Sequence, residues 1–203
     1  MKSFLIAAAF ALLCLPAHGQ SSRPTPEPAA GPTSKPASNG ETTKVKLKDL
    51  TLSVPGAWKR LGAKPMRVAT FSISPVEGDT NGAEMAVYHF GPQSVDDNVQ
   101  RWIKQFEEKD RQQKVTQGKA TAGAYVFVDV SGTYKKSVGR PMGGKTQSVP
   151  GQRMLGVILT LDSTGVYFLK LVGPAKTVEA QAKALRSSFG AKAEGETKYK
   201  KSL

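Results

Sequence analysis

The chain contains few side chains of the kinds that perform catalysis. Beyond residue 19 it has one histidine, His89, and no cysteine. A Ser-His-Asp nucleophile needs a histidine to accept the serine proton, and a zinc site ordinarily needs several His or Cys ligands. Alternation places His89 at the end of a strand, where a structural histidine at the rim of the core is the common outcome. This inventory favours a protein that is not an enzyme and that carries no metal or other cofactor.

One stretch reproduces a nucleotide-binding motif letter for letter. Residues 139–146 read GRPMGGKT and satisfy the pattern G-x-x-x-x-G-K-[ST] of phosphate-binding loops. Such a loop works because its backbone N–H groups and the N-terminus of the following helix point at the phosphates. Residues 147–151 read QSVPG, which leaves no room for that helix. We therefore expect no nucleotide binding here.

The same region carries positive charge without any acid. Residues 135–151 run between two apolar stretches, and a loop of that length is usually either functional or mobile. We consider it a contact surface for an anionic partner, with a mobile, solvated hairpin tip as the alternative. Its basic residues are Lys135, Lys136, Arg140 and Lys145.

Three charged residues interrupt stretches that are otherwise apolar: Asp129, Arg153 and Lys170. A charge inside a sheet persists only when it is paired, so we expect Asp129 to contact one of the two cations. If the three charges instead line an open cleft with Tyr134, they could bind a small anionic ligand. A hydrolase with a cleft around Asp129 is the enzymatic alternative.

The first nineteen residues have the pattern of a secretory signal peptide. Lys2 precedes a thirteen-residue apolar stretch, Phe4 to Pro16, and small residues follow at Ala17 and Gly19. The stretch is shorter than the roughly 18 residues of a membrane span. We expect export to the periplasm or the extracellular space, with cleavage near Gly19. Lipidation at Cys14 is the alternative, although the preceding leucine disfavours it.

Composition divides the remainder into three parts. Residues 20–43 are rich in Pro and Ser without an apolar period, which predicts a disordered linker. Residues 44–190 have the length and apolar content of one α+β domain. Residues 191–203 contain four lysines, and we expect a basic, disordered tail.

The chain is strongly basic, with 29 Lys and Arg against 16 Asp and Glu and a net charge of +13. Such a chain attracts anions. For an exported protein, an anionic surface or an acidic protein of the envelope is a more plausible partner than nucleic acid. The charge does not decide the oligomeric state.

Apolar periodicity predicts six to seven strands and two helices. The first helix is expected over residues 94–110, with Ser94 as its N-cap, and the second over residues 177–189, with Gly190 as its C-cap. Their order predicts an α+β fold with a mainly antiparallel sheet flanked by two helices. The strands are expected at residues 45–54, with a slip near Asp49, and at 66–74, 83–90, 114–120, 125–134, 153–161 and 166–172.

Short motifs in this order resemble the PsbP-like α/β/α sandwich: VPGAW at residues 54–58, LVGP at 171–174 and SF at 188–189. The chain also resembles uncharacterised exported bacterial proteins of that type, in NVQRW at 98–102, DVSGTY at 129–134 and RMLG at 153–156. The resemblance implies a non-enzymatic binding or assembly module of the cell envelope. It assigns no metal-binding residue, because no ligand of metal-binding relatives can be matched.

Overall fold

The structure is a computed structural model that describes residues 41–138, 144–161 and 165–201. The expected signal peptide, residues 20–40 of the expected linker, and Arg140 lie outside the described residues. Among the described residues, no helix is long and apolar enough to cross a membrane.

One antiparallel sheet of eight strands organises the described residues, in the order β10-β6-β7-β8-β9-β5-β4-β3. The expected α+β fold with a mainly antiparallel sheet is confirmed, with short edge strands raising the strand number above the predicted six to seven. The strands are β3 (Lys59–Arg60), β4 (Ala69–Ile73), β5 (Ala83–Phe90), β6 (Gln112–Ala120), β7 (Gly123–Ser137), β8 (Thr146–Leu161), β9 (Gly165–Pro174) and β10 (Thr197–Lys198).

Residues 42–55 form a separate two-stranded hairpin, β1 (Thr42–Leu47) and β2 (Leu50–Pro55). The single strand expected at residues 45–54 is therefore wrong. Lys48 has a φ of 55°, a left-handed conformation that reverses the chain at the position read as a slip. Since β1 begins at Thr42, the predicted linker over residues 20–43 extends two residues too far.

The first helix, α1 (Val95–Ile103), begins as expected, since the Ser94 hydroxyl accepts a hydrogen bond of 3.2 Å from the Asp97 N–H. It ends at Ile103 and not near residue 110, and a 3-10 turn, η1 (Glu108–Asp110), follows. The expected C-terminal helix is split into α2 (Ala175–Ala180) and α3 (Ala182–Ser188). At the break, the Gln181 side chain accepts a hydrogen bond of 2.9 Å from the Trp58 indole.

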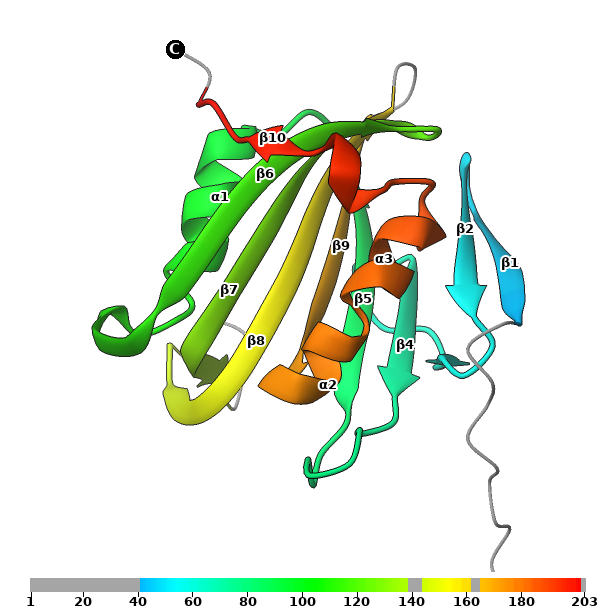
Figure 1. Ribbon diagram of the computed structural model, residues 1–203. Coiled ribbons are helices and arrows are strands. Elements are labelled where there is room, and N and C mark those ends of the chain that lie inside the picture. The colour runs from blue at the N-terminus through cyan, green and yellow to red at the C-terminus, as the bar shows by residue number, and fades with distance from the viewer. Residues whose placement is uncertain (1–40, 139–143, 162–164, 202–203) are drawn as a thin grey trace, which may run out of the picture. The chain divides into compact units, whose positions relative to one another are not determined.

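The two faces of the sheet carry separate apolar cores. On one face α2, α3 and the β1–β2 hairpin cover the odd-numbered side chains of β8, such as Val157 and Leu159. On the other face α1 places Trp102 and Ile103 over Val128 and Phe168. Figure 1 shows α2 and α3 on one side of the sheet and α1 on the other. Because α1 is short, it covers only part of its face.

Residues 191–201, the described part of the tail that was expected to be disordered, contain regular structure. A 3-10 turn, η2 (Ala193–Gly195), leads into β10, which pairs with β6. The carboxylate of Glu196 accepts hydrogen bonds of 2.6 Å from Arg186 Nε and 2.7 Å from the Thr116 hydroxyl. The prediction was based on the lysines of the segment and did not consider Glu196, the buried acid that anchors it.

Candidate functional site

Strands β7 and β8 continue beyond the sheet as a two-stranded arm. Lys135 pairs with Ser148 and Ser137 with Thr146, so most of the seventeen-residue loop expected at residues 135–151 is strand. The register shifts between Gly132 and Tyr134, and Gly151 on the partner strand has a φ of 67°. The extra residue lies on β8 and puts Val149 on the groove side of the arm, the side that Tyr134 shares with Val130 by alternation.

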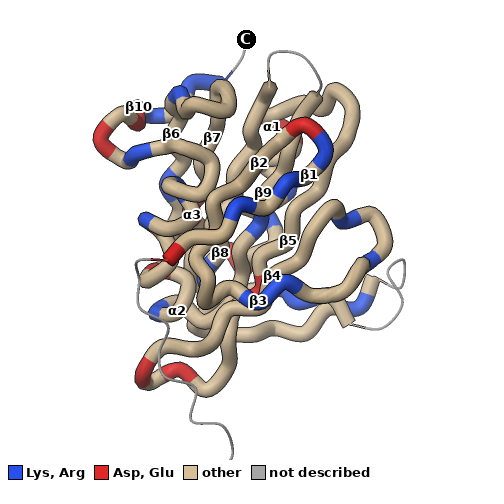
Figure 2. Tube along the Cα trace, turned by 90° about the vertical axis from the view of Figure 1, so that its right-hand side faces the viewer, with Lys and Arg blue, Asp and Glu red and all other residues tan. Residues whose placement is uncertain are grey.

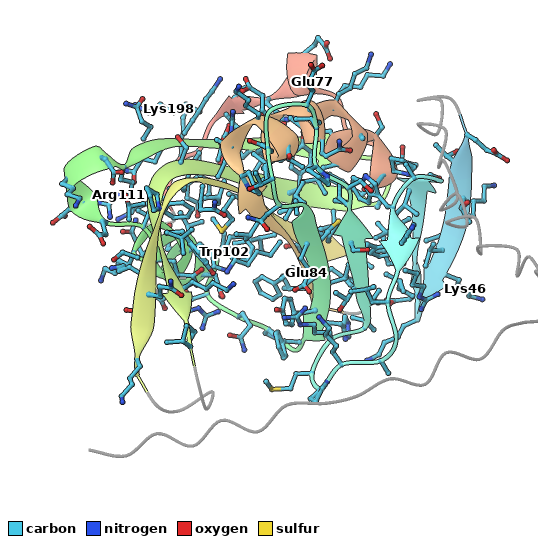
Figure 3. All side chains as sticks on the ribbon, turned by 90° about the horizontal axis from the view of Figure 1, so that it is seen from below. Lys46, Glu77, Glu84, Trp102, Arg111 and Lys198 are labelled. Atoms are coloured by element: carbon cyan, nitrogen blue, oxygen red, sulfur yellow. The ribbon has the colours of Figure 1, made fainter. Side chains whose placement is uncertain are left out.

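A groove of about 720 Å³ lies between this arm and β5, with β9 as part of its floor. In Figure 3 the labelled Glu84 lies between the arm and the edge strands β4 and β3. The volume is within the usual range of sites for small molecules. The charged, aromatic and amide side chains that line this groove are Arg67, Asn81, Glu84, Tyr88, Tyr134, Lys136, Gln152 and Lys170.

Lys170 places a half-buried ammonium in this groove. Its Nζ donates hydrogen bonds to Gln105 Oε1 and, over 3.3 Å, to the Tyr134 hydroxyl, and it lies 5.5 Å from the centre of the Tyr134 ring. Burial, together with the smaller effect of the Arg67 and Arg101 charges, lowers the pKa of Lys170 to about 8. None of the ion pairs among the described residues includes Lys170. Its charge therefore has only neutral partners.

The one carboxylate that lines the groove is already neutralised. Glu84 accepts hydrogen bonds of 2.6 Å from Arg67 Nη1 and 2.7 Å from Lys64 Nζ. Burial opposes ionisation of Glu84, but these two cations outweigh it and lower the pKa of the carboxyl. Arg67 also lies 5.7 Å from the centre of the Tyr88 ring. With Glu84 paired twice, Lys170 and Lys136 leave the groove with net positive charge.

The segment after α1 holds Tyr134 in position. The Lys135 N–H bonds to the Gln105 carbonyl over 2.7 Å, and the rings of Phe106 and Tyr134 lie 5.2 Å apart. Burial raises the pKa of Tyr134, so the phenol is neutral at physiological pH and can donate a hydrogen bond. The early end of α1 thus supplies Gln105 and Phe106 as supports for one wall of the groove.

Asp129 and Arg153 form a bidentate ion pair away from the groove. Arg153 Nε and Nη2 donate to the two Asp129 oxygens over 2.8 and 2.7 Å, and Arg153 Nη1 lies 3.4 Å from Glu179 of α2. Asp129 thus contacts one of the two cations, as expected. Arg153 and Lys170 project from opposite faces of the sheet, because Lys170 pairs with Gly156, three positions from Arg153. The three charges therefore do not line one cleft.

Of the predicted site residues, the structure brings together Tyr134, Lys136 and Lys170. Lys135 points to the other side of the arm by alternation, and Lys145 is exposed near its end. The sequence reading missed Arg67, Glu84, Tyr88 and Gln105. The sequence contains one indication of this wall of the groove: Glu84 and Tyr88 lie on the same face of a mainly apolar strand.

Comparison with known proteins gives likeness to a solved structure but no sequence relative. No family model matches the chain, and a search of curated proteins gives no match either. The chain is similar to the solution structure of cyanobacterial PsbP (CyanoP) from Synechocystis sp. PCC 6803, with 16% identity, coverage of 83% of this chain and 100% of that chain, and a TM-score of 0.40. At this identity and TM-score the likeness supports no conclusion about family, binding or partners.

Proposed function

We propose that this protein is a non-enzymatic binding module that takes up an anionic ligand in the groove between the β7–β8 arm and β5. The observation that carries the proposal is Lys170, a half-buried ammonium whose hydrogen-bond partners are all neutral. Burying a charge without a counter-charge costs free energy, so this lysine is unfavourable for folding. An anion that enters the groove supplies the missing counter-charge.

The lining defines the chemistry of the ligand. Lys170 and Lys136 attract a carboxylate or phosphate, and the Tyr134 hydroxyl adds a neutral donor. The rings of Tyr88 and Tyr134 offer apolar surfaces on either side of the floor. Arg67 is held by Glu84 and serves to shape the wall. These features suit a small carboxylate or phosphate ester with a flat apolar body.

The geometry favours binding over hydrolysis. A hydrolase around Asp129 needs that carboxylate to be available to a substrate, yet both of its oxygens accept hydrogen bonds from Arg153. Glu84 is likewise held by two cations. With the expected signal peptide, we place this binding module in the periplasm or outside the cell, where it meets ligands of the envelope.

The test is a binding titration that is monitored by isothermal calorimetry and by the shifts of amide NMR signals. We use benzoate and phenyl phosphate as probes and benzamide as the neutral control. Lys170→Met should weaken binding of the anions roughly 10- to 100-fold, the effect of losing a charge-assisted hydrogen bond. Lys183→Met, which removes an exposed lysine of α3, should leave it unchanged. Equal binding of benzamide and benzoate, or no shift of groove amides, would refute the proposal.

Catalysis is tested on the same samples. Nitrophenyl esters and phosphates incubated with the protein should be recovered intact. Turnover that disappears in Asp129→Asn, with the fold retained, would restore the enzymatic alternative.

A further inference from the structure

A turn between β3 and β4 holds a methionine in an unfavourable backbone conformation. The Arg67 N–H bonds to the Lys64 carbonyl over 3.2 Å and closes a four-residue turn in which Pro65 and Met66 are central. Met66 has a φ of 61°. In turns with proline second and a positive φ third, the third position favours glycine, because a side chain there is strained.

The same methionine gains nothing from burial. Its side chain is 79% exposed, the largest value among the large hydrophobic residues that the described ranges leave on the surface. Leu61, which begins the same loop, is 36% exposed. An apolar side chain that is both strained and hydrated does not help the fold. Backbone strain of this kind concentrates at sites where a protein meets a ligand or partner.

Positive charge predominates around this loop, where Glu84 is paired with both Lys64 and Arg67. Figure 2 shows basic positions along β1 and again at β3 and in the loop that follows it. Between residues 42 and 67 the one acid is Asp49, whose carboxylate accepts a hydrogen bond from the Tyr167 hydroxyl. The exposed cations of β1 and β3 are Lys44, Lys46, Lys59 and Arg60, and none of the ion pairs among the described residues includes them.

We propose that this Met66 surface, formed by β1, β3 and residues 61–67, docks on an anionic phospholipid bilayer. Met66 and Leu61 enter between the head groups, and the four cations contact the phosphates. Apolar side chains at the tip of a cationic surface favour binding to an anionic membrane interface, because the apolar groups are buried and the cations contact the phosphates. A polyanion such as heparin would bind to the cations, but Met66 would contribute nothing to that binding. The inference does not depend on the ligand groove, to which these four cations do not contribute.

Vesicle co-sedimentation tests the proposal. The purified protein should bind vesicles of phosphatidylcholine with 30% phosphatidylglycerol and should not bind pure phosphatidylcholine. Met66→Gly should bind about five- to tenfold more weakly, since the inserted side chain is lost. It should unfold at the same or a higher temperature, because glycine suits the turn, so misfolding cannot explain the loss. Met66→Leu should bind like the wild type.

The charges are tested separately. Lys59→Gln with Arg60→Gln should weaken binding roughly 25-fold, at about fivefold for each cation near the surface. The matched control, Lys176→Gln with Lys183→Gln, removes two exposed lysines from α2 and α3 and should have little effect. Absence of vesicle binding, or equal binding by wild type and Met66→Gly, would overturn the proposal. Retention on heparin that is the same in both, together with no vesicle binding, would point to a polyanion.

Discussion

Replacing Lys170 with methionine should stabilise the free protein near neutral pH. The pKa of this amine falls from 10.5 to about 8 on folding, and each unit corresponds to about 1.4 kcal/mol, so burying the charge costs at most about 3 kcal/mol. Because the side chain is half-buried, water relieves part of this cost. Methionine also gives up the hydrogen bonds to Gln105 and Tyr134 and the contact with the Tyr134 ring, together about 1–2 kcal/mol. The net expected gain is about 1 kcal/mol.

The sign of the pH dependence follows from the direction of the pKa shift. Between the folded and unfolded pKa values, from about pH 8 to 10.5, the unfolded chain binds a proton that the folded chain lacks. Wild-type stability therefore rises over that window relative to Lys170→Met. The advantage of the variant should be full below pH 8 and lost by about pH 10.5.

Urea denaturation at pH 7 and pH 10, followed by the fluorescence of Trp58 and Trp102, measures both quantities. In thermal denaturation at pH 7, the midpoint temperature should rise by about 2–4 °C for a gain of about 1 kcal/mol in a chain of this size. Lys183→Met is the matched control and should change neither value. A variant that is less stable than wild type at pH 7, or that keeps its full advantage at pH 10, would refute the reasoning about the buried charge.

Three further changes test other parts of the structure. Met66→Gly should raise the free energy of unfolding by roughly 0.5–1 kcal/mol in urea, since relief of a left-handed methionine exceeds the entropy cost of glycine; a lower value would contradict the turn geometry. Gly156→Ala should cost roughly 2 kcal/mol or more and change the near-ultraviolet circular dichroism, because the added Cβ lies 2.3 Å from the Trp102 ring; an unchanged midpoint would show that α1 can move away. Glu196→Gln should cost roughly 2 kcal/mol at neutral pH by leaving Arg186 without its acid. Burial opposes ionisation of Glu196, but Arg186 and Thr116 lower its pKa, so wild-type stability from this pair is present above about pH 4.5 and lost as the pH falls through the lowered pKa. A Glu196→Gln defect that persists undiminished in acid would contradict that assignment.

The elements that the sequence predicted well are those in which local pattern and burial agree. Strand β5 has the expected bounds because both of its faces are apolar, and α1 begins where Ser94 can accept the Asp97 N–H. The pairing of Asp129 with a cation followed from the cost of an unpaired charge in a strand. None of these inferences required knowledge of distant neighbours.

The ligand groove could not be predicted from local sequence pattern. It depends on β9 lying between β8 and β5, which brings Lys170 beside Tyr134 and within reach of Gln105. It also depends on the extra residue in β8 opposite Gly132, which puts Val149 on the groove side of the arm. Strand order and bulges are set by contacts between residues far apart in the chain.

Two other misses have a simple physical origin. The hairpin at residues 42–55 has apolar residues in both arms, and a two-residue turn between them looks like a slip in one longer strand. The C-terminal segment was judged by its lysines, whereas its order comes from Glu196. In both cases a single residue, Lys48 or Glu196, decides the local structure.

Proton uptake on ligand binding tests the central claim most directly. If an anion pairs with the Lys170 ammonium, it raises the pKa of that amine, and binding at pH 8 takes up to about half a proton from the buffer. Calorimetry of benzoate binding at pH 8, in buffers of different ionisation enthalpy, gives the number of protons taken up. Phenyl phosphate is measured in the same way and corrected for the titration of its own phosphate, with benzoate as the reference. The account predicts uptake that approaches about half a proton for benzoate with the wild type. Benzoate binding to the groove with no proton uptake would contradict it.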